Sequence, residues 1–179
     1  MTTPRYTGTA ITLHWLIAAG ILCTFVLGTY MADLPLSPWK LKLFSWHKWA
    51  GVTIFLLAAL RLGWRAGHRP PELPAMPVWQ LRAATWTHLA LYALMFAIPL
   101  TGWLMSSAKG FTTVYFGVLP LPDLLAKDLA LGKQLAEVHE TLAWLMLALV
   151  GTHAAAALKH HLLDKDDVLK RMLPRFGRS

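Results

Sequence analysis

Four long runs of apolar residues dominate the chain, and short polar segments separate them. The runs cover about Ala10–Met31, Phe44–Trp64, Ala84–Ser107 and Glu137–His161. A helix needs about 20 apolar residues to cross the hydrocarbon core of a bilayer, and each run reaches that length. The pattern therefore predicts an all-α integral membrane protein, in which residues 1–179 form a single domain, a bundle of four transmembrane helices.

The segments between the apolar runs contain residues that interrupt helices. Asp33–Lys42 and the basic connector Gly67–Gln80 are rich in proline and are expected to be irregular. The segment Asp123–Leu135 is a candidate for a short helix at the membrane interface. Pro99 lies inside the third run and predicts a kink. The first run is too long for the apolar part of a signal peptide and no small-residue cleavage site follows, so we expect Ala10–Met31 to be retained.

Composition and charge agree with a membrane protein. Hydrophobic residues make up 56% of the chain and charged residues 15%, whereas soluble domains carry about 25% charged residues. Eleven of the 17 lysines and arginines fall on the side that holds both termini, which predicts that both termini are cytoplasmic. The net charge of +8 thus belongs mainly to one membrane surface, and no nucleic-acid partner is expected. A single cysteine, Cys23, excludes a disulfide framework and cysteine-ligated iron–sulfur clusters.

Histidines inside the apolar runs are the candidate functional residues, because ionisable groups in a membrane span are costly. His139 and His153 are separated by about 21 Å along one helix and point the same way to within about 40°. By depth, His47 joins His139 near the outer surface, while His14 and His88 lie with His153 near the inner surface. A b-type haem needs two axial imidazoles and no covalent attachment. The spacing indicates one outer pair and an inner pair chosen from three histidines.

Other interpretations of these histidines are weaker. A zinc site needs three or four ligands close together, and His139-Glu140 does not begin an H-E-x-x-H motif because position 143 is alanine. A proton relay would not explain why the two histidines of the fourth run share a face. Interfacial histidines bonded to carbonyls or headgroups are the alternative without a cofactor. Gly51, one turn after His47, leaves room for a porphyrin or for close helix packing. Met146 is interpreted as packing rather than as a ligand.

Several short motifs resemble a known family. They are LHWL at Leu13–Leu16, HETLA at His139–Ala143, HAAAALKHH at His153–His161 and the closing RMLPR. The chain resembles the bacterial cytochrome b561 family from Arg5 to the tail, most closely its superoxide oxidase branch. The resemblance implies a multi-pass protein of the bacterial inner membrane with two haem b groups as cofactors. It also implies electron transfer from periplasmic superoxide to ubiquinone, and no amino-acid side chain is assigned a catalytic role.

The histidine placement is also similar to that of cytochrome b subunits in membrane hydrogenases and formate dehydrogenases. Carried over, that pattern pairs His14 with His153 and His47 with His139 as axial ligands of haem iron. It also suggests an alternative function, a cytochrome b subunit that relays electrons between a periplasmic dehydrogenase partner and the quinone pool. A structural membrane protein without haem is the third possibility, and the visible spectrum separates it from the other two.

Residues for the two substrates are less clearly indicated. Six lysines on the outer side would attract the superoxide anion, although five carboxylates there leave a net charge of +1. His160 follows His153 by two turns on the same face to within about 20°, and is a candidate to contact quinone unless it only caps the helix. His88 is a candidate for quinone or for a haem propionate. Arg61 and Arg65 would meet propionates, or they only mark the cytoplasmic side.

Overall fold

Four long helices account for most of the computed structural model, which describes residues 5–72 and 76–174. The helices are α1 (Gly8–Ala32), α2 (Pro38–Gly67), α3 (Val78–Ala108) and α4 (Leu129–Leu162). Between α3 and α4 lies a small antiparallel hairpin of β1 (Val114–Tyr115) and β2 (Leu119–Pro120), and a single 3₁₀ turn, η1 (Lys170–Met172), follows α4. The predicted fold class, a membrane bundle of four helices, is confirmed.

The helices are long enough to cross a bilayer and extend beyond it. They contain between 25 and 34 residues, which corresponds to about 37 to 51 Å. Each has an apolar stretch suitable for a membrane span. Large apolar side chains such as Val26, Leu56 and Leu145 are exposed on the outside of the bundle. In a membrane protein these side chains contact lipid, so their exposure is expected.

All four helices begin earlier than the hydrophobic pattern predicted, α1 by two residues and the other three by six to eight. Helix α2 begins at Pro38, where Ser37 caps the helix by accepting a hydrogen bond from the Lys40 amide. Helix α3 begins at Val78 rather than Ala84. Helix α4 begins at Leu129 because Asp128 accepts hydrogen bonds from two amides of the first turn. The predicted short helix over residues 123–135 is therefore wrong, because its second half is the start of α4.

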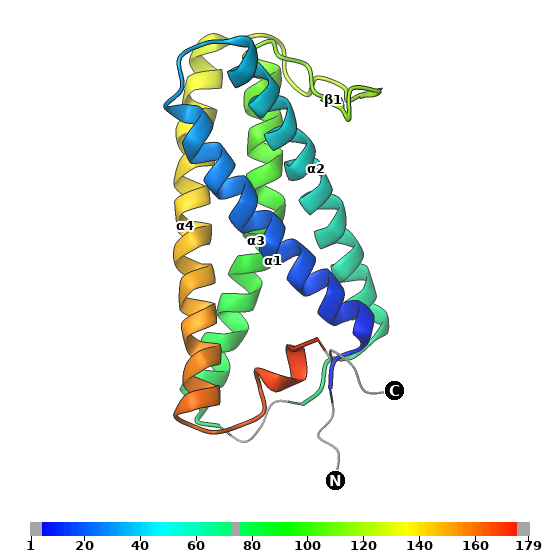
Figure 1. Cartoon of the computed structure of the whole chain (residues 1–179), viewed down its shortest axis with the longest axis vertical. Coiled ribbons are helices and arrows are strands. Elements are labelled where there is room, and N and C mark those ends of the chain that lie inside the picture. Colours follow the sequence, from blue (N-terminus) through cyan, green and yellow to red (C-terminus); the bar gives the residue numbers. More distant parts are fainter. Residues whose placement is uncertain (1–4, 73–75, 175–179) are drawn as a thin grey trace.

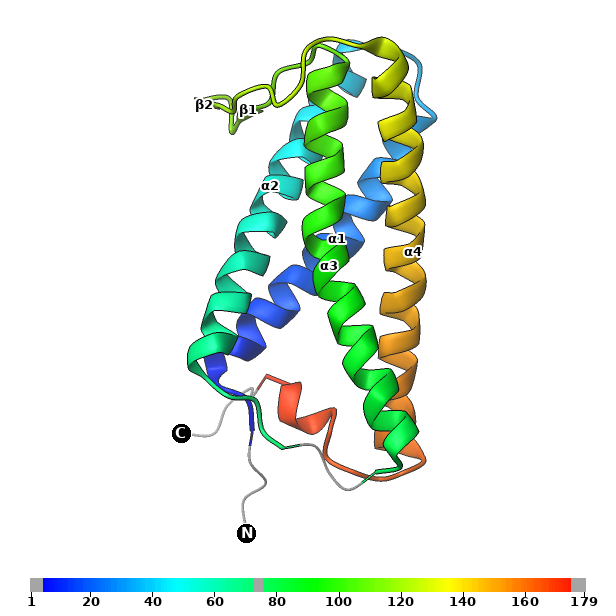
Figure 2. The ribbon, with the colours of Figure 1, turned by 180° about the vertical axis from the view of Figure 1, so that it is seen from behind.

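The helices run alternately up and down, and both ends of the described chain lie at one end of the bundle (Figure 1). We call this the termini end and the opposite end the loop end. Helix α1 crosses the bundle obliquely, whereas α3 and α4 lie side by side (Figures 1 and 2). Helix α3 contains Pro99 and bends near its middle, as Figure 2 shows. The proline removes a backbone donor there, so the predicted kink is present.

The packed core sits midway between the two ends. Its buried side chains come from all four helices and are Ile17, Ile54, Ala58, Leu94, Met95 and Met146. Met146 is 3% exposed within this cluster, so it packs as predicted. At the termini end the segment after α4 turns back across the bundle (Figure 2). Arg5 Nη2 donates to the Leu173 carbonyl (2.6 Å) and Trp15 Nε1 donates to the Met172 carbonyl (2.8 Å).

Candidate cofactor sites

The helix histidines gather at two levels of the bundle. His47 of α2 and His139 of α4 lie opposite each other toward the loop end, with ring centroids 6.2 Å apart. His14 of α1 and His153 of α4 lie opposite each other toward the termini end, with the same separation of 6.2 Å. The structure thus brings together both pairs that the sequence resemblance implies.

The spacing of both pairs suits two imidazoles on one metal ion. A metal–imidazole bond is about 2.0 Å long and the ring centre lies about 1 Å beyond the bonded nitrogen, so two opposed ligand rings have centroids about 6 Å apart. The ring planes are inclined by 74° in the His47–His139 pair and by 68° in the His14–His153 pair. Both pairs therefore have the separation that axial ligation of a haem iron requires.

His88 of α3 is the third histidine near the termini end. Its ring centroid lies 5.3 Å from that of His153, which is shorter than the separation expected for two rings on one metal. The sequence left the partner of His153 open between His14 and His88. The ring spacing favours His14 and leaves His88 beside the pair.

The ring of His139 is held in one tautomer. Its Nδ1 lies 3.0 Å from the Ile98 carbonyl oxygen, and a carbonyl can only accept, so Nδ1 must carry the proton. The Thr101 hydroxyl lies 3.3 Å from the same nitrogen. The unprotonated Nε2 is then free to bind a metal, the arrangement typical of metal-ligating histidines. Sequence reasoning missed this contact, because Ile98 belongs to another helix and its carbonyl has no sequence signature.

Two glycines allow the loop-end rings to sit this close to the neighbouring helices. A Cβ at Gly28 of α1 would lie 3.1 Å from His47 Cε1, and one at Gly102 of α3 would lie 3.0 Å from His139 Cε1. Both distances are shorter than normal carbon–carbon contacts of about 3.5 to 4.0 Å. The sequence analysis singled out Gly51 instead, where an added Cβ would have no neighbour within 4 Å.

An apolar cavity of about 610 Å³ adjoins the loop-end pair. Both histidines line it, together with Gly51 and core residues such as Ile54 and Leu94. Sites for cofactors commonly have mostly apolar walls. His47 Nδ1 is buried in this region and has no hydrogen-bond partner among residues 5–72 and 76–174. The opposed rings, the fixed tautomer of His139 and the glycine contacts fit a b-type haem.

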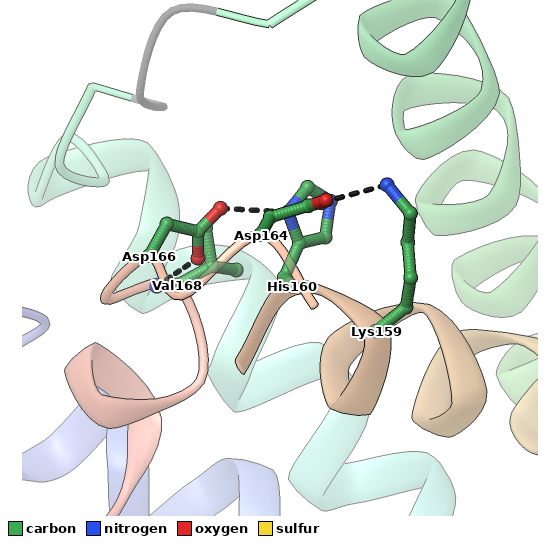
Figure 3. Close-up of polar contacts among 5 residues, drawn as sticks. All are labelled: Lys159, His160, Asp164, Asp166 and Val168. Atoms are coloured by element: carbon green, nitrogen blue, oxygen red, sulfur yellow. Dashed lines mark hydrogen bonds and ion pairs between the residues drawn. The ribbon is translucent and has the colours of Figure 1, made fainter. Parts of the chain in front are cut away.

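His160 lies near the end of α4, in a group of charged side chains (Figure 3). Its Nδ1 is 2.7 Å from Asp166 Oδ2 and 3.2 Å from Asp164 Oδ2. Asp164 also pairs with Lys159 Nζ at 2.7 Å, and Asp166 Oδ1 accepts from the Val168 amide. The side chain of His160 is only 16% exposed. The sequence analysis missed both aspartates, because they follow the helix and fold back onto it.

The side chains of His160, Asp164 and Asp166 place their potential metal-ligand atoms within 4.8 Å of one another. The Asp164 carboxylate is already paired with Lys159, and the Asp166 carboxylate accepts from the ring of His160 or pairs with it. We therefore describe the group as an ion-pair cluster that orients His160 rather than as a metal site.

The lysines expected to attract superoxide are partly engaged in local contacts. Lys48 Nζ, next to His47, donates to the Phe111 carbonyl at 3.1 Å. Lys40 Nζ donates to the Ala32 carbonyl at the end of α1, and Lys42 lies 5.3 Å from the ring centre of Trp46. These contacts tie the loop-end segments to the helices.

Comparisons with known proteins identify the family of this chain. The family model described as prokaryotic cytochrome b561 matches residues 5–175. The chain is 38% identical to cytochrome b561 homolog 2 of Escherichia coli (strain K12), over 96% of this chain and 93% of that protein. It is 34% identical to cytochrome b561 homolog 1 of the same organism, over 96% and 98%. A protein of Yersinia pestis named probable superoxide oxidase CybB is 28% identical, over 96% and 97%.

The match spans all four helices and nearly the full length of each relative. An opposed pair of histidines inside a helix bundle is an arrangement that can hold a b-type haem. The chain is a bacterial membrane redox protein of the prokaryotic cytochrome b561 family.

Proposed function

We propose that this protein is a superoxide:ubiquinone oxidoreductase of the bacterial inner membrane that contains two b haems. His47 and His139 would hold the iron of one haem, and His14 and His153 would hold that of the other. The equal ring separation of 6.2 Å in the two pairs is the observation that supports the two haem sites. The whole chain, residues 1–179, acts as one domain with both termini in the cytoplasm, which the distribution of basic residues supports.

When bound, the two haems supply reversible one-electron transfer, with one near each membrane surface. The protein's own residues do the rest. The hydrogen bond from His139 Nδ1 to the Ile98 carbonyl fixes the ring orientation and makes Nε2 more basic. Gly28 and Gly102 keep the ligand rings from being displaced by neighbouring helices. The walls of the cavity beside the loop-end pair are mostly apolar, which suits the apolar face of a porphyrin.

Superoxide is the proposed electron donor on the loop-end side. Two superoxide anions each give up one electron and leave as O₂, while ubiquinone takes both electrons and two protons to become ubiquinol. The name of the Yersinia pestis relative, probable superoxide oxidase, supports this choice. Lys48, beside His47 and bonded to a loop carbonyl, contributes positive charge where a small anion would arrive.

Ubiquinone is the proposed acceptor at the termini end, and His160 is the residue we assign to it. When the ring of His160 is neutral, its Nδ1–H donates a hydrogen bond to the Asp166 carboxylate, which leaves Nε2, on the other side of the ring, as a hydrogen-bond acceptor. When the ring is protonated, Nε2 can donate a proton to a quinone oxygen. His88, beside His153, is assigned to the quinone or to a haem propionate.

A rapid-mixing experiment tests the donor and the cofactors together. Oxidised purified protein is mixed with an enzymatic superoxide source, with and without superoxide dismutase, and dithionite gives the fully reduced reference. We expect reduced b-haem bands that dismutase abolishes, followed by reoxidation on addition of ubiquinone. Bands with dithionite but none with superoxide would refute the superoxide donor. The variants His47→Ala and His14→Ala are each expected to lose one haem. His68→Ala is the matched control, because His68 is exposed, and it should keep both haems.

The alternative is a cytochrome b subunit that receives electrons from a periplasmic dehydrogenase. One observation favours it, the hairpin of β1 and β2, which projects sideways from the loop end (Figures 1 and 2). Phe116, Val118 and Leu119 of this hairpin are 60%, 83% and 56% exposed. Such an apolar tip suits contact with a partner or with lipid. The absence of superoxide-driven reduction in the isolated protein, together with normal dithionite bands, would favour this function.

A further inference from the structure

A second cavity, of about 450 Å³, opens at the termini end of the bundle. It lies between the start of α1, the end of α2 and the connector that follows α2, and Tyr92 of α3 forms part of its wall. Neither aspartate nor glutamate occurs among the described residues that line it. The side chains that can carry positive charge there are Arg5, Arg61, Arg65, His68 and Arg69.

Tyr92 holds two of these guanidinium groups side by side. Arg61 Nε donates to the Tyr92 hydroxyl at 3.0 Å, and Arg65 Cζ lies 6.0 Å from the centre of the Tyr92 ring. Arg61 and Arg65 are one turn apart on α2, where like charges repel each other. The packing therefore maintains two neighbouring positive charges without a carboxylate in the cavity wall to offset them.

Arg61 also has an unused donor. Its Nη1 is buried and has no hydrogen-bond partner among the described residues. A charged donor buried without an acceptor is costly. A guanidinium pairs best with an oxyanion, because its N–H groups match carboxylate and phosphate oxygens in pairs. The missing partner is therefore expected to be an anionic oxygen.

The rest of the wall suits a ligand that arrives from the membrane surface. His68 stacks on the indole of Trp64, with ring centroids 3.9 Å apart and an interplanar angle of 5°. Trp64 Nε1 donates to the Thr7 hydroxyl at 2.9 Å. These contacts fix the shape of the mouth between α2 and the chain before α1. The exposed Arg69 and His68 open the cavity toward solvent and headgroups.

We propose that this cavity binds a phosphate group, either that of an anionic phospholipid in the adjacent leaflet or free phosphate. Phosphate offers several oxygens to several arginines at once, and basic pockets between helices on the cytoplasmic side are known to bind anionic headgroups. The proposal does not depend on superoxide or ubiquinone being the substrates.

A binding titration tests the site with the haem-loaded protein in neutral detergent. The probes are a short-chain phosphatidylglycerol, a short-chain phosphatidylcholine and inorganic phosphate, and the readout is the thermal midpoint of unfolding at each concentration. We expect a saturable rise with phosphatidylglycerol or with phosphate, and none with phosphatidylcholine. The variant Arg65→Gln/Arg69→Gln should bind at least about tenfold more weakly, because each lost charged contact is worth about 1.5 kcal/mol or more.

Arg82→Gln is the matched control, since Arg82 is an exposed arginine near the start of α3 that does not line the cavity. Equal weakening in Arg82→Gln would show a general surface-charge effect and overturn the proposal. A wild-type protein that responds to neither anionic probe would also overturn it. The visible spectrum verifies that each variant is folded. If the double variant does not fold, Arg69→Gln alone, at an exposed position of the connector, replaces it in the titration. A response to inorganic phosphate alone would identify free phosphate as the ligand.

Discussion

Replacing Gly102 by alanine tests whether the glycine contact positions His139. The new Cβ would lie 3.0 Å from Cε1 and 3.2 Å from Nδ1 of the ring, so the ring must move by about 0.5 Å to reach a normal contact distance. A shift of that size along the hydrogen bond would lengthen the 3.0 Å contact of Nδ1 with the Ile98 carbonyl to about 3.5 Å, where the bond is largely lost. Loss of a supporting contact of this type typically lowers metal affinity about 10- to 100-fold.

We therefore expect Gly102→Ala to lose the loop-end haem or to convert it to a high-spin form. The assay is the haem-to-protein ratio, together with the visible and electron paramagnetic resonance spectra of the purified protein. Gly151→Ala on α4 is the matched control, because an added Cβ there meets nothing within 4 Å. Alanine in a helix is otherwise more favourable than glycine by up to about 1 kcal/mol, so the control should be slightly stabilised. Identical low-spin haem content in both variants would refute the positioning role of Gly102.

Three further predictions follow from the contacts at the two ends. His14→Ala should lose one low-spin haem whereas His88→Ala should keep both, because only His14 has the ligand spacing to His153; the haem-to-protein ratio decides between them. Asp166→Asn should leave the spectra unchanged but slow the reoxidation of the reduced protein by ubiquinone, and equal rates would remove Asp166 from the quinone site. Asp128→Ala should lower the stability of α4 by about 1 kcal/mol, measured by thermal unfolding.

The sequence predicted the number of helices and their apolar parts, since an apolar run of about 20 residues is a strong signal for a membrane-spanning helix. It did not predict where the helices begin. The start of α2 at Pro38 and of α4 at Leu129 depends on the capping hydrogen bonds of Ser37 and Asp128, which lie in polar segments. Hydropathy describes the part of a helix inside the membrane, whereas caps determine how far the helix continues outside it.

The histidine pairs could be predicted from the sequence for two reasons. The depth of a histidine in the membrane follows from its position along a span, and the direction in which its side chain points follows from helical periodicity. The supporting residues were not. Gly28 and Gly102 matter only because α1 and α3 approach the rings of the neighbouring helices closely. Asp166 reaches His160 because the chain reverses direction after α4. Such contacts join elements whose relative positions no local pattern specifies.

Different hydrogen bonds hold the non-helical segments against the helices at the two ends of the bundle. At the loop end, the hairpin and its flanking loop are tied to α2 through Trp49 Nε1 to the Val114 carbonyl (2.7 Å) and through Tyr115, whose hydroxyl lies 2.9 Å from that of Thr53. At the termini end, Trp15 of α1 and Arg5, just before α1, donate to backbone carbonyls of the segment after α4. Arg171 of this segment donates to the Glu72 carbonyl of the connector at 2.6 Å. Such hydrogen bonds contribute about 0.5 to 1.5 kcal/mol each, so this segment can open locally without unfolding the helices. An opening of this kind would give a quinone access near His160.

Trp15→Phe tests this local opening, because it removes the hydrogen bond to the Met172 carbonyl (2.8 Å) and keeps an aromatic ring at the position. The amides of Arg171 and Met172, which are bonded within the segment, should exchange with deuterium about 2- to 10-fold faster, in keeping with one lost hydrogen bond. Trp49→Phe is the matched control at the loop end and should accelerate exchange in the hairpin instead. Unchanged exchange at residues 171 and 172 in Trp15→Phe would mean that other contacts hold the segment closed, and quinone access would then require a different path between the helices.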